Sequence, residues 1–252
     1  MKPTLIATLV LSTILCSPAA AQIAIEKMRG SSDPSLITDL SYSFRQGFAK
    51  TTVLSLRSTG SLERWGTSFL LLGQIDYGRH NGTRFRDRSL GHIRAVPHFS
   101  DRFHGEVFSL VEKDGFALRR LRYLYGAGFR YDIASNEVGA FEGGIALMRE
   151  HESLYEARLE VHPAVVDANY FSIHSHVRWQ ISESVSFQNT LYFQPRLDDF
   201  ADRRIDDSAR LTVKINDNLS LTTNFSLRYD SKPPDPVAKT DMSISNGLRI
   251  AL

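Results

Sequence analysis

Apolar and polar residues alternate along most of the chain from about residue 36 onward, with a period of two. The segment 120–132 shows the pattern clearly. With Leu124 as the exception, its apolar set is Leu121, Tyr123, Tyr125, Ala127, Phe129 and Tyr131, and its polar set is Arg120, Arg122, Gly126, Gly128, Arg130 and Asp132. Because successive side chains of a strand point to opposite faces, this pattern predicts a β-strand with one apolar and one charged face.

The same alternation recurs in runs at 38–45, 65–77, 171–180, 219–229 and 242–252. Many runs are longer than the roughly five or six residues of an ordinary globular strand. A tilted strand that crosses a bilayer needs about 9–11 residues, and a closed barrel leaves no backbone edge in lipid. The runs therefore predict an all-β fold, an antiparallel transmembrane up-and-down β-barrel. A soluble β-sandwich or soluble barrel is the alternative.

Connection lengths set the number of strands. About thirteen runs qualify, whereas bacterial single-chain barrels have even strand counts, short periplasmic turns and longer external loops. Counting from both ends places short periplasmic turns at 100–102, 135–136, 182–184 and 216–218 and external connections at 78–88, 194–204 and 231–238. The two counts agree only if the run 154–162 does not span. We therefore predict about twelve spanning strands and an external excursion over about 150–168.

The N-terminus has the form of a secretory signal peptide. Lys2 precedes an apolar stretch over 5–15, and small residues follow and end in an A-x-A motif at Ala21. Cleavage there would divide the chain into a signal peptide, 1–21, and a barrel, 22–252. The sequence thus predicts export and insertion into the outer membrane of a Gram-negative bacterium.

Composition narrows the classes of function. The single cysteine, Cys16, lies in the predicted signal peptide, so the mature chain would have no internal disulfide. The 30 Lys and Arg residues nearly balance the 28 Asp and Glu residues, which argues against a nucleic-acid partner. No glycine-rich phosphate loop, cysteine-based metal motif or nucleophile elbow is present. We therefore expect no cofactor.

Two blocks of the chain resemble a known family. They are EKDGF at 112–116 followed by GAGFRY at 126–131, and YDSKPP at 229–234 followed by KTD at 239–241. In these blocks the chain resembles the YdiY-like salt-induced outer-membrane proteins, a family otherwise called a domain of unknown function. The resemblance implies an outer-membrane barrel with no established reaction. Leu252 stands where such barrels usually end in Phe or Tyr, which implies a weaker assembly signal.

Ser172, His174 and His176 alternate along one predicted strand and so share its lumenal face. An H-x-H pattern could hold a metal ion, and a Ser–His pair could act as nucleophile and base, as in outer-membrane lipid hydrolases. Those hydrolases expose the pair toward the outer leaflet, whereas this set points inward. Since no third orienting group is identifiable, we interpret the three residues as polar lining, with no catalytic role and no metal.

Charged residues of both signs share the predicted lumenal face. They are Arg120, Arg122, Arg130 and Asp132 on one strand and Glu106, Glu112 and Glu142 on its neighbours. Opposite charges in close quarters tend to pair, which favours a structural plug of ion pairs. A barrel of about twelve strands lies between side-chain-filled and open-channel sizes, so a narrow pore or gate is the alternative. Gly126 and Gly128 indicate strand bending or close lumenal packing.

The segment 78–88 is predicted to be an external basic loop. Its arginines are Arg79, Arg84, Arg86 and Arg88. Such a cluster could form charge-assisted hydrogen bonds with lipopolysaccharide, although solvated loop charge is the simpler interpretation. The expected partners are outer-membrane lipids, lipopolysaccharide and the barrel-assembly machinery.

These patterns predict a non-enzymatic outer-membrane barrel, and the family resemblance adds an envelope or salt-stress role. Two other functions remain open. One is a lipid-acting enzyme, a phospholipid or lipid A hydrolase that uses Ser172 with His174 or His176. The other is a narrow passive pore.

Overall fold

The computed structural model describes residues 34–47, 50–155, 163–234 and 237–250. The predicted signal peptide, the terminal Leu252 and the central part of the predicted excursion, 156–162, lie outside these residues. No helix long and apolar enough to cross a membrane occurs in the described ranges.

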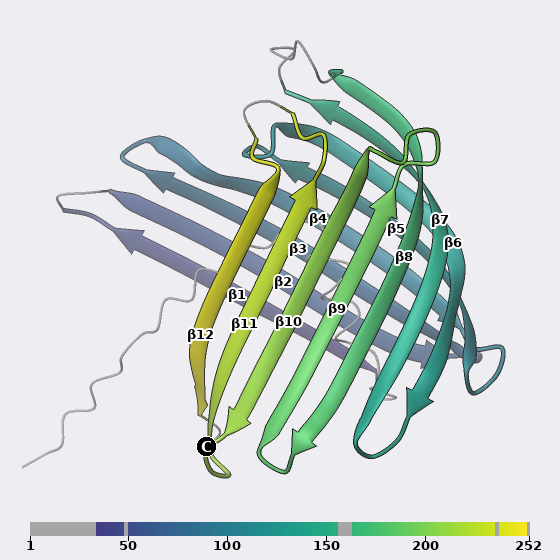
Figure 1. Ribbon diagram of the computed structural model, residues 1–252. Coiled ribbons are helices and arrows are strands. Elements are labelled where there is room, and N and C mark those ends of the chain that lie inside the picture. The colour runs from purple at the N-terminus through teal and green to yellow at the C-terminus, as the bar shows by residue number, and fades with distance from the viewer. Residues whose placement is uncertain (1–33, 48–49, 156–162, 235–236, 251–252) are drawn as a thin grey trace, which may run out of the picture.

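Twelve strands form one antiparallel sheet in which each strand pairs with its neighbours in sequence (Figure 1). They are β1 (Ser35–Arg45), β2 (Thr51–Arg64), β3 (Thr67–His80), β4 (Thr83–Pro97), β5 (Phe103–Asp114), β6 (Arg119–Ser135), β7 (Gly139–Leu154), β8 (Val165–Ser182), β9 (Val185–Pro195), β10 (Arg203–Lys214), β11 (Leu219–Asp230) and β12 (Thr240–Ile250). The shortest strands have 11 residues and β8 has 18, enough to cross a bilayer. This confirms the predicted all-β, up-and-down fold and its strand count.

Connections differ between the two ends of the sheet. One end carries the connections 46–50, 81–82, 115–118, 155–164, 196–202 and 231–239, and the other carries 65–66, 98–102, 136–138, 183–184 and 215–218. Bacterial barrels have short periplasmic turns and longer external loops, so the first end is the external one. The four predicted periplasmic turns all fall at the other end.

The prediction of a basic loop at 78–88 is wrong. The strands β3 and β4 continue through most of it and leave only Asn81 and Gly82 as a two-residue turn, with φ of 47° and 84°. Positive φ at both positions is the geometry of a type I′ hairpin turn, which favours Asn-Gly. The arginines of this segment therefore lie on strands rather than in a loop.

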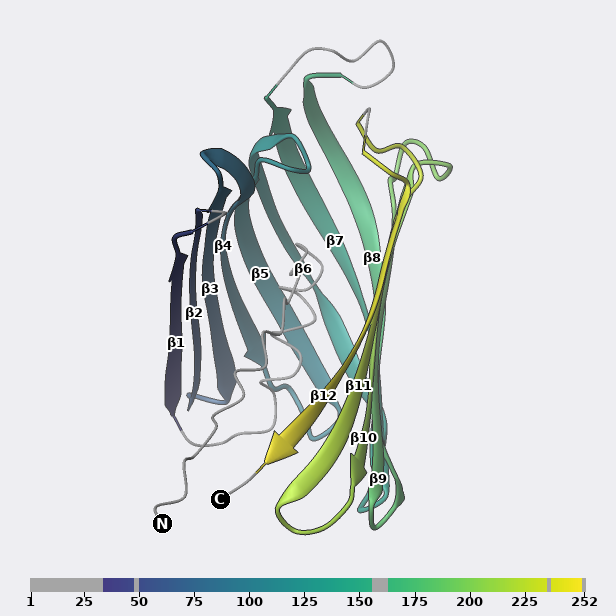
Figure 2. The same cartoon turned by 90° about the vertical axis from the view of Figure 1, so that its left-hand side faces the viewer.

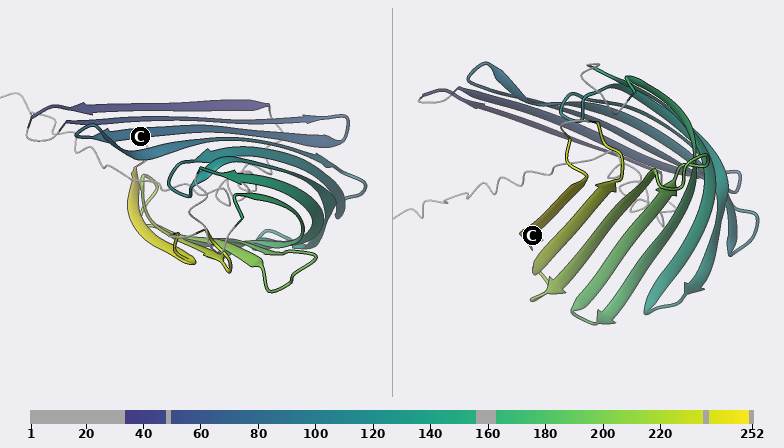
Figure 3. Two further views of the ribbon diagram at one scale, coloured as in Figure 1. Left: turned by 90° about the horizontal axis from the view of Figure 1, so that it is seen from above. Right: turned by 45° about the horizontal axis from the view of Figure 1, so that its top comes forward.

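The sheet curls so that its first and last strands face each other. Figure 2 shows β1 to β4 on one side and β9 to β12 on the other, and we call the space that the concave face surrounds the lumen. The view from above in Figure 3 shows a flatter arm, β1 to β4, and a strongly curved remainder. No hydrogen-bonded ladder joins β1 to β12 in the described residues, so these two strands are the edges of the sheet.

Large apolar side chains cover the convex face. On β7, Leu147 is 57% exposed while the next residue, Met148, is 3% exposed. The same alternation runs along the neighbouring strands, as the sequence pattern predicted. At the periplasmic end the exposed aromatic residues Trp65, Tyr131 and Trp179 lie where barrels carry an interfacial girdle.

The concave face is not uniformly polar. A cluster of buried apolar side chains, which we call the apolar layer, crosses β3 to β8. On β4 to β7 it lies between charged residues on either side along the strand, whereas Val166 and Ala168 on β8 stand opposite Glu152 and Glu150. The apolar layer consists of Leu70, Leu72, Leu90, Phe108, Leu110, Leu124, Ala146, Met148, Val166, Ala168 and Tyr170. Leu124, the exception in the alternation of its run, is one member of this layer.

Glycines make room for large side chains on the concave face. A Cβ added at Gly126 would lie 2.6 Å from the Phe108 ring, and one at Gly144 would overlap the ring of His174, which stands opposite it on β8. Gly128 is similarly tight against Ala146 on β7. The predicted close lumenal packing at Gly126 and Gly128 is therefore confirmed.

We expect Gly144→Ala to lower the stability of the barrel by about 1–3 kcal/mol, because the added methyl must displace the His174 ring. The measurement is the temperature at which the compact band is lost on a gel. Gly143→Ala is the matched control, since its Cβ would meet the nearest atom, of Ile133, at 3.4 Å. Equal midpoints for the two variants would contradict this account.

Candidate functional site in the lumen

Charged side chains gather in two groups on the concave face. We call the group nearer the external end the external cluster; it consists of Arg88, Glu112, Asp114, Arg119, Arg122, Glu150, Glu152, Arg204, Asp206, Arg228 and Asp230. The periplasmic cluster consists of Arg94, Glu106, Arg130, Glu142 and His174. On β4 to β7 residues of the apolar layer separate the two.

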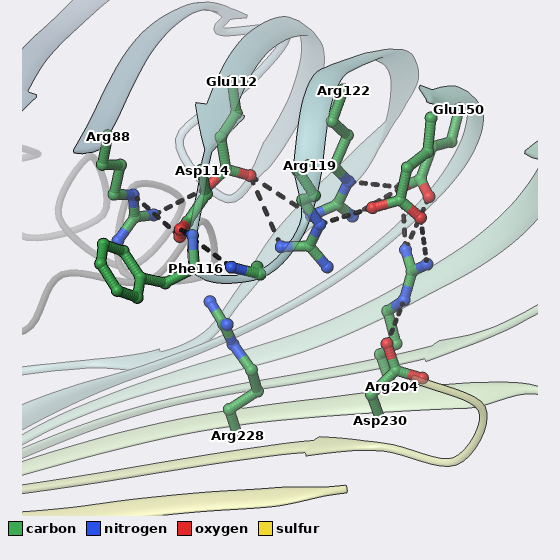
Figure 4. A network of polar contacts seen from close by, with 12 residues as sticks. Arg88, Glu112, Asp114, Phe116, Arg119, Arg122, Glu150, Arg204, Arg228 and Asp230 are labelled. Atoms are coloured by element: carbon green, nitrogen blue, oxygen red, sulfur yellow. Dashed lines mark hydrogen bonds and ion pairs between the residues drawn. The ribbon is translucent and has the colours of Figure 1, made fainter. Parts of the chain in front are cut away.

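Glu150 is at the centre of the external cluster (Figure 4). It is fully buried and accepts hydrogen bonds from Arg122 Nε and Nη2 at 2.8 and 2.6 Å. Arg204 Nη1 donates to both of its oxygens, at 2.9 and 2.8 Å. Arg122 is on the adjacent strand β6, but Arg204 is on β10, and β8 and β9 separate it from Glu150 on β7. This contact therefore crosses the lumen.

Arg204 is held by further groups. Its Nε lies 3.3 Å from Asp230 on β11, and its guanidinium lies 4.9 Å from the centre of the Tyr170 ring on β8. Glu152 is two residues from Glu150 on β7. It lies 3.8 Å from Arg204 Nη2 and accepts a 2.5 Å hydrogen bond from Arg119 Nε. Carboxylates on two strands and an aromatic face thus fix one cation.

Glu112 extends the external cluster to the opposite wall. It accepts a 2.8 Å bond from Arg88 on β4 and lies 3.8 Å from both Arg119 and Arg122 on β6. Together with the contacts of Arg204, these pairs form a continuous charged network from β4 to β11. Beside the network lies a small cavity of about 20 Å³, which is close to the volume that one water needs.

The periplasmic cluster is arranged around Arg130, which is 1% exposed. Its Nε donates to Glu106 at 2.7 Å and its Nη1 donates to Glu142 at 2.9 Å. Arg94 lies 3.7 Å from Glu106, and His174 lies 3.6 Å from Glu142. The sequence identified Arg130 and both glutamates as lumenal charges, and the structure brings them together.

A series of hydrogen-bonded polar side chains, which no sequence pattern predicted, lies at the periplasmic end of the concave face. The Ser68 hydroxyl is hydrogen-bonded to His98 Nε2 at 2.8 Å, and His98 Nδ1 is hydrogen-bonded to His104 Nδ1 at 2.9 Å. His104 Nε2 in turn lies 3.2 Å from an oxygen of Asp132. The four residues come from three strands and one turn. No local sequence motif joins them, so only the sheet register reveals the chain.

Ser172, His174 and His176, the candidate hydrolase or metal site, lie on the concave face. Ser172 is 2% exposed and accepts a 3.2 Å bond from Gln194, while His174 packs 5.2 Å from the Tyr192 ring. His176 Nδ1 bonds the Thr190 hydroxyl at 2.8 Å. Across the described ranges, no three His, Cys, Asp or Glu side chains are grouped so that they could hold a metal ion.

The predicted lumenal position of Arg120 is wrong. The pairing of β6 with β7 shifts register between Arg119 and Leu121, so Arg120 is exposed and Arg119 takes the buried place beside Glu152. Arg122 and Arg130 are buried as predicted, and Asp132 is half-buried.

The arginines of the predicted basic loop divide between two surroundings. Arg79 and Arg84 are exposed and lie 6.0 and 5.9 Å from the centre of the Tyr77 ring. Arg86 is half-buried, and Arg88 is buried in the external cluster. Only the first two form an exposed basic surface at this hairpin.

Two external loops are joined by an ion pair. Lys232, in the loop after β11, donates a 2.5 Å bond to Asp199, in the loop after β9. This bond lowers the pKa of Asp199 below its ordinary value of 3.8 and raises the pKa of Lys232. In the same loop, burial raises the pKa of Asp202. The pair connects both loops over the curved half of the sheet.

The sheet and its lumen define a class of protein. A single antiparallel meander of long strands, apolar on its convex face and charged on its concave face, is the architecture of outer-membrane β-barrels. The chain belongs to the family described as protein of unknown function DUF481, whose model matches residues 38–251. This match confirms the family resemblance seen in the sequence.

Comparison with solved structures adds a likeness of fold. The chain is similar to a structure of the NanC porin, with 10% sequence identity and a TM-score of 0.44, over 86% of this chain and 99% of that chain. No curated protein matches the chain.

We expect Lys232→Gln to speed hydrogen exchange in the loop 196–202 at neutral pH, because it removes the partner of Asp199. The pKa of Asp199 is depressed in the folded protein, so the attraction is present above its ordinary pKa of 3.8 and is lost as the pH falls through the lower folded value. The rates of the wild type and the variant should therefore converge in acid. Lys214→Gln, which breaks the pair with Asp217 in a periplasmic turn, is the control. Equal exchange at neutral pH would refute the coupling of the loops.

Proposed function

We propose that the protein is a non-enzymatic β-barrel of the bacterial outer membrane whose lumen is closed to free diffusion, and that it serves the envelope under salt or osmotic stress. The observation that carries the closed lumen is the contact of Arg204 with Glu150 across it. The stress role is supported by the family resemblance alone.

Location in the outer membrane follows from three features taken together. The predicted signal peptide would deliver the chain to the periplasm. The convex face then offers apolar side chains to lipid, while the strands from β2 to β11 are hydrogen-bonded on both sides within the sheet. Insertion of such a sheet would need the barrel-assembly machinery, and outer-membrane lipids and lipopolysaccharide would be its surroundings.

A closed lumen is favoured over a passive pore by the order of layers along it. An ion moving along the wall formed by β4 to β7 would meet the external cluster, then residues of the apolar layer, then the periplasmic cluster. Breaking a buried ion pair to let an ion pass leaves an uncompensated charge, which costs about 3–5 kcal/mol.

Burial also explains how such a lumen would behave as external salt rises. Salt screens exposed charge pairs strongly, with a Debye length of about 3 Å at 1 M, but it screens buried pairs much less. Glu150 and Glu152 are 0% and 2% exposed. The external cluster would therefore stay paired in concentrated salt, which is what a barrel that must not leak under salt stress requires.

A lipid hydrolase is not favoured by the geometry. Ser172 is 2% exposed and lies on the concave face, whereas lipid contacts the convex face. Ser68, which bonds His98, is half-buried at the periplasmic end of the concave face. A nucleophile in either place would not meet a bilayer lipid.

The closed lumen predicts that wild-type protein in planar bilayers gives at most small, rare conductance steps, and that Arg204→Ala gives larger and more frequent ones. The substitution removes the side chain that crosses from β10 to β7. Arg210→Ala is the matched control, because Arg210 is on the same strand, half-buried and bonded to Asn224 outside the external cluster. Large, frequent steps from the wild type would mean an open pore.

The stress role predicts a growth difference in cells. A strain that lacks the gene should grow more slowly than its parent in medium with raised NaCl but equally well in ordinary medium. Complementation with the wild type should restore growth, and complementation with Arg204→Ala should not, because a leaking lumen fails under salt. A deletion strain that grows like its parent at every salt concentration would refute the role while leaving the conductance result intact.

A further inference from the structure

The external end of the flatter arm, β1 to β4, carries exposed positive charge. Arg79 and Arg84 lie on either side of the β3–β4 turn, while Arg45 ends β1 and Lys50 lies in the connection after it. All four side chains are exposed. We call these four residues the basic rim.

The acids of the protein do not neutralise the basic rim. Asp87 accepts a 2.8 Å hydrogen bond from Arg84, and it also lies 3.5 Å from Lys113 on β5. In the part of the chain that the structure describes, the other three members of the rim form no ion pair. The rim therefore keeps an excess of positive charge.

The external loops of the curved half of the sheet differ in this respect. There Arg196 pairs with Asp198 at 2.6 Å, and Lys232 pairs with Asp199. The cations of those loops thus have carboxylates of the protein as partners, whereas most of the basic rim has none.

A β-bulge places the two arginines of the hairpin side by side. The pairing of β3 with β4 shifts register after Gly78, so Arg79 stands opposite Arg84. Phe85 is the extra residue, and its ring lies against Gly78, where an added Cβ would be 2.7 Å from it. In a regular register Phe85 would stand opposite Arg79, and Arg84 would point to the concave face. Bulges at the rims of barrels commonly re-aim a side chain in this way.

The two arginines share the convex face with Tyr77. Burial alternates along β3, so that Asp76 and Gly78 are buried on the concave face while Tyr77 and Arg79 face outward. Both guanidinium groups lie about 6 Å from the centre of the Tyr77 ring. Like charges directly opposite each other on neighbouring strands destabilise a sheet. An anion bound between the two guanidinium groups would remove this repulsion.

The depth of the pair in the membrane follows from the aromatic residues of the same hairpins. Trp65, in the periplasmic turn, and Tyr77 are twelve residues apart, which is about 40 Å along an extended strand. At a tilt of about 45° this corresponds to about 28 Å across the membrane, close to the apolar band of about 25 Å in such barrels. Arg79 and Arg84 therefore lie just beyond the external end of the apolar band, at the level of lipid headgroups.

We propose that the basic rim binds the phosphorylated headgroup of an outer-leaflet lipopolysaccharide, with a phosphate group between Arg79 and Arg84 and acyl chains on the convex face below Tyr77. Guanidinium and phosphate groups form strong charge-assisted hydrogen bonds, often two at a time. A membrane lipid fits better than a soluble anion because exposed apolar side chains, such as Ile75, continue along the convex face directly below the pair. The inference rests on the outer-membrane location in the proposed function, but neither on the closed lumen nor on the stress role.

The test measures the temperature at which the refolded full-length mature protein in detergent loses its compact band on a gel. The additions are lipid A with two phosphates, dephosphorylated lipid A, and inorganic phosphate at the same concentration. A ligand that binds the folded state raises the midpoint, so diphosphorylated lipid A should raise it and the other two should not. The double variant Arg79→Gln/Arg84→Gln should need about 10- to 100-fold more lipid A for the same rise, the effect of losing hydrogen bonds to a charged group.

Two controls separate loss of the site from loss of the fold. Without lipid, the double variant should be at least as stable as the wild type, because it removes two like charges that stand opposite each other. Arg64→Gln is the matched control, since Arg64 is also exposed and lies 4.6 Å from the centre of the Trp65 ring, but at the periplasmic end of the same arm. This variant should respond to lipid A as the wild type does.

An equal response of the double variant and the wild type to lipid A would overturn the proposal, as would an equal response to the phosphorylated and dephosphorylated lipids. A rise with inorganic phosphate equal to that with lipid A would mean a site for a free anion instead. Cell fractionation tests the location separately. A chain found only in the soluble periplasmic fraction would refute the outer-membrane location, whereas a heat-modifiable outer-membrane band that lipid A does not stabilise would refute this inference alone.

Discussion

Glu150 is buried completely, and a buried carboxylate must be paired or the fold loses several kcal/mol. Its partners are Arg122 on the adjacent strand and Arg204 on β10, three strands along the sheet. The second contact exists only when the sheet has curled far enough to bring β10 opposite β7. Pairing of one carboxylate thereby depends on the curvature of the whole sheet.

The distribution of side chains reverses that of a soluble protein, because apolar residues face outward and charges face inward. The alternation has a cost for the lumen, since each buried ion must find a partner of opposite sign. Strands with one charged face nevertheless stay less prone to pair with other chains in water than strands that are apolar on both faces.

How much the sequence could predict depends on whether the determinant is local. The twelve strands and their periplasmic turns follow from a period of two and from chain reversals, which short segments encode. Arg119 rather than Arg120 is buried because the pairing of β6 with β7 shifts register, and no single strand encodes such a shift. The Asn-Gly pair at 81–82 is typical of a hairpin turn, but the four arginines around it favoured the interpretation as a basic loop. The contact of Arg204 with Glu150 required the curl of the whole sheet.

The sequence separation of that contact has a consequence for the order of assembly. Glu150 and Arg204 are 54 positions apart, and two complete strands lie between them. Until β10 joins the sheet, Glu150 has only one of its two arginines and the growing wall stays hydrated. The pairing of Glu150 with Arg204 is therefore a contact that only the nearly complete sheet can make. The charge that holds the curled form together has nothing to hold in any shorter piece of the same sheet.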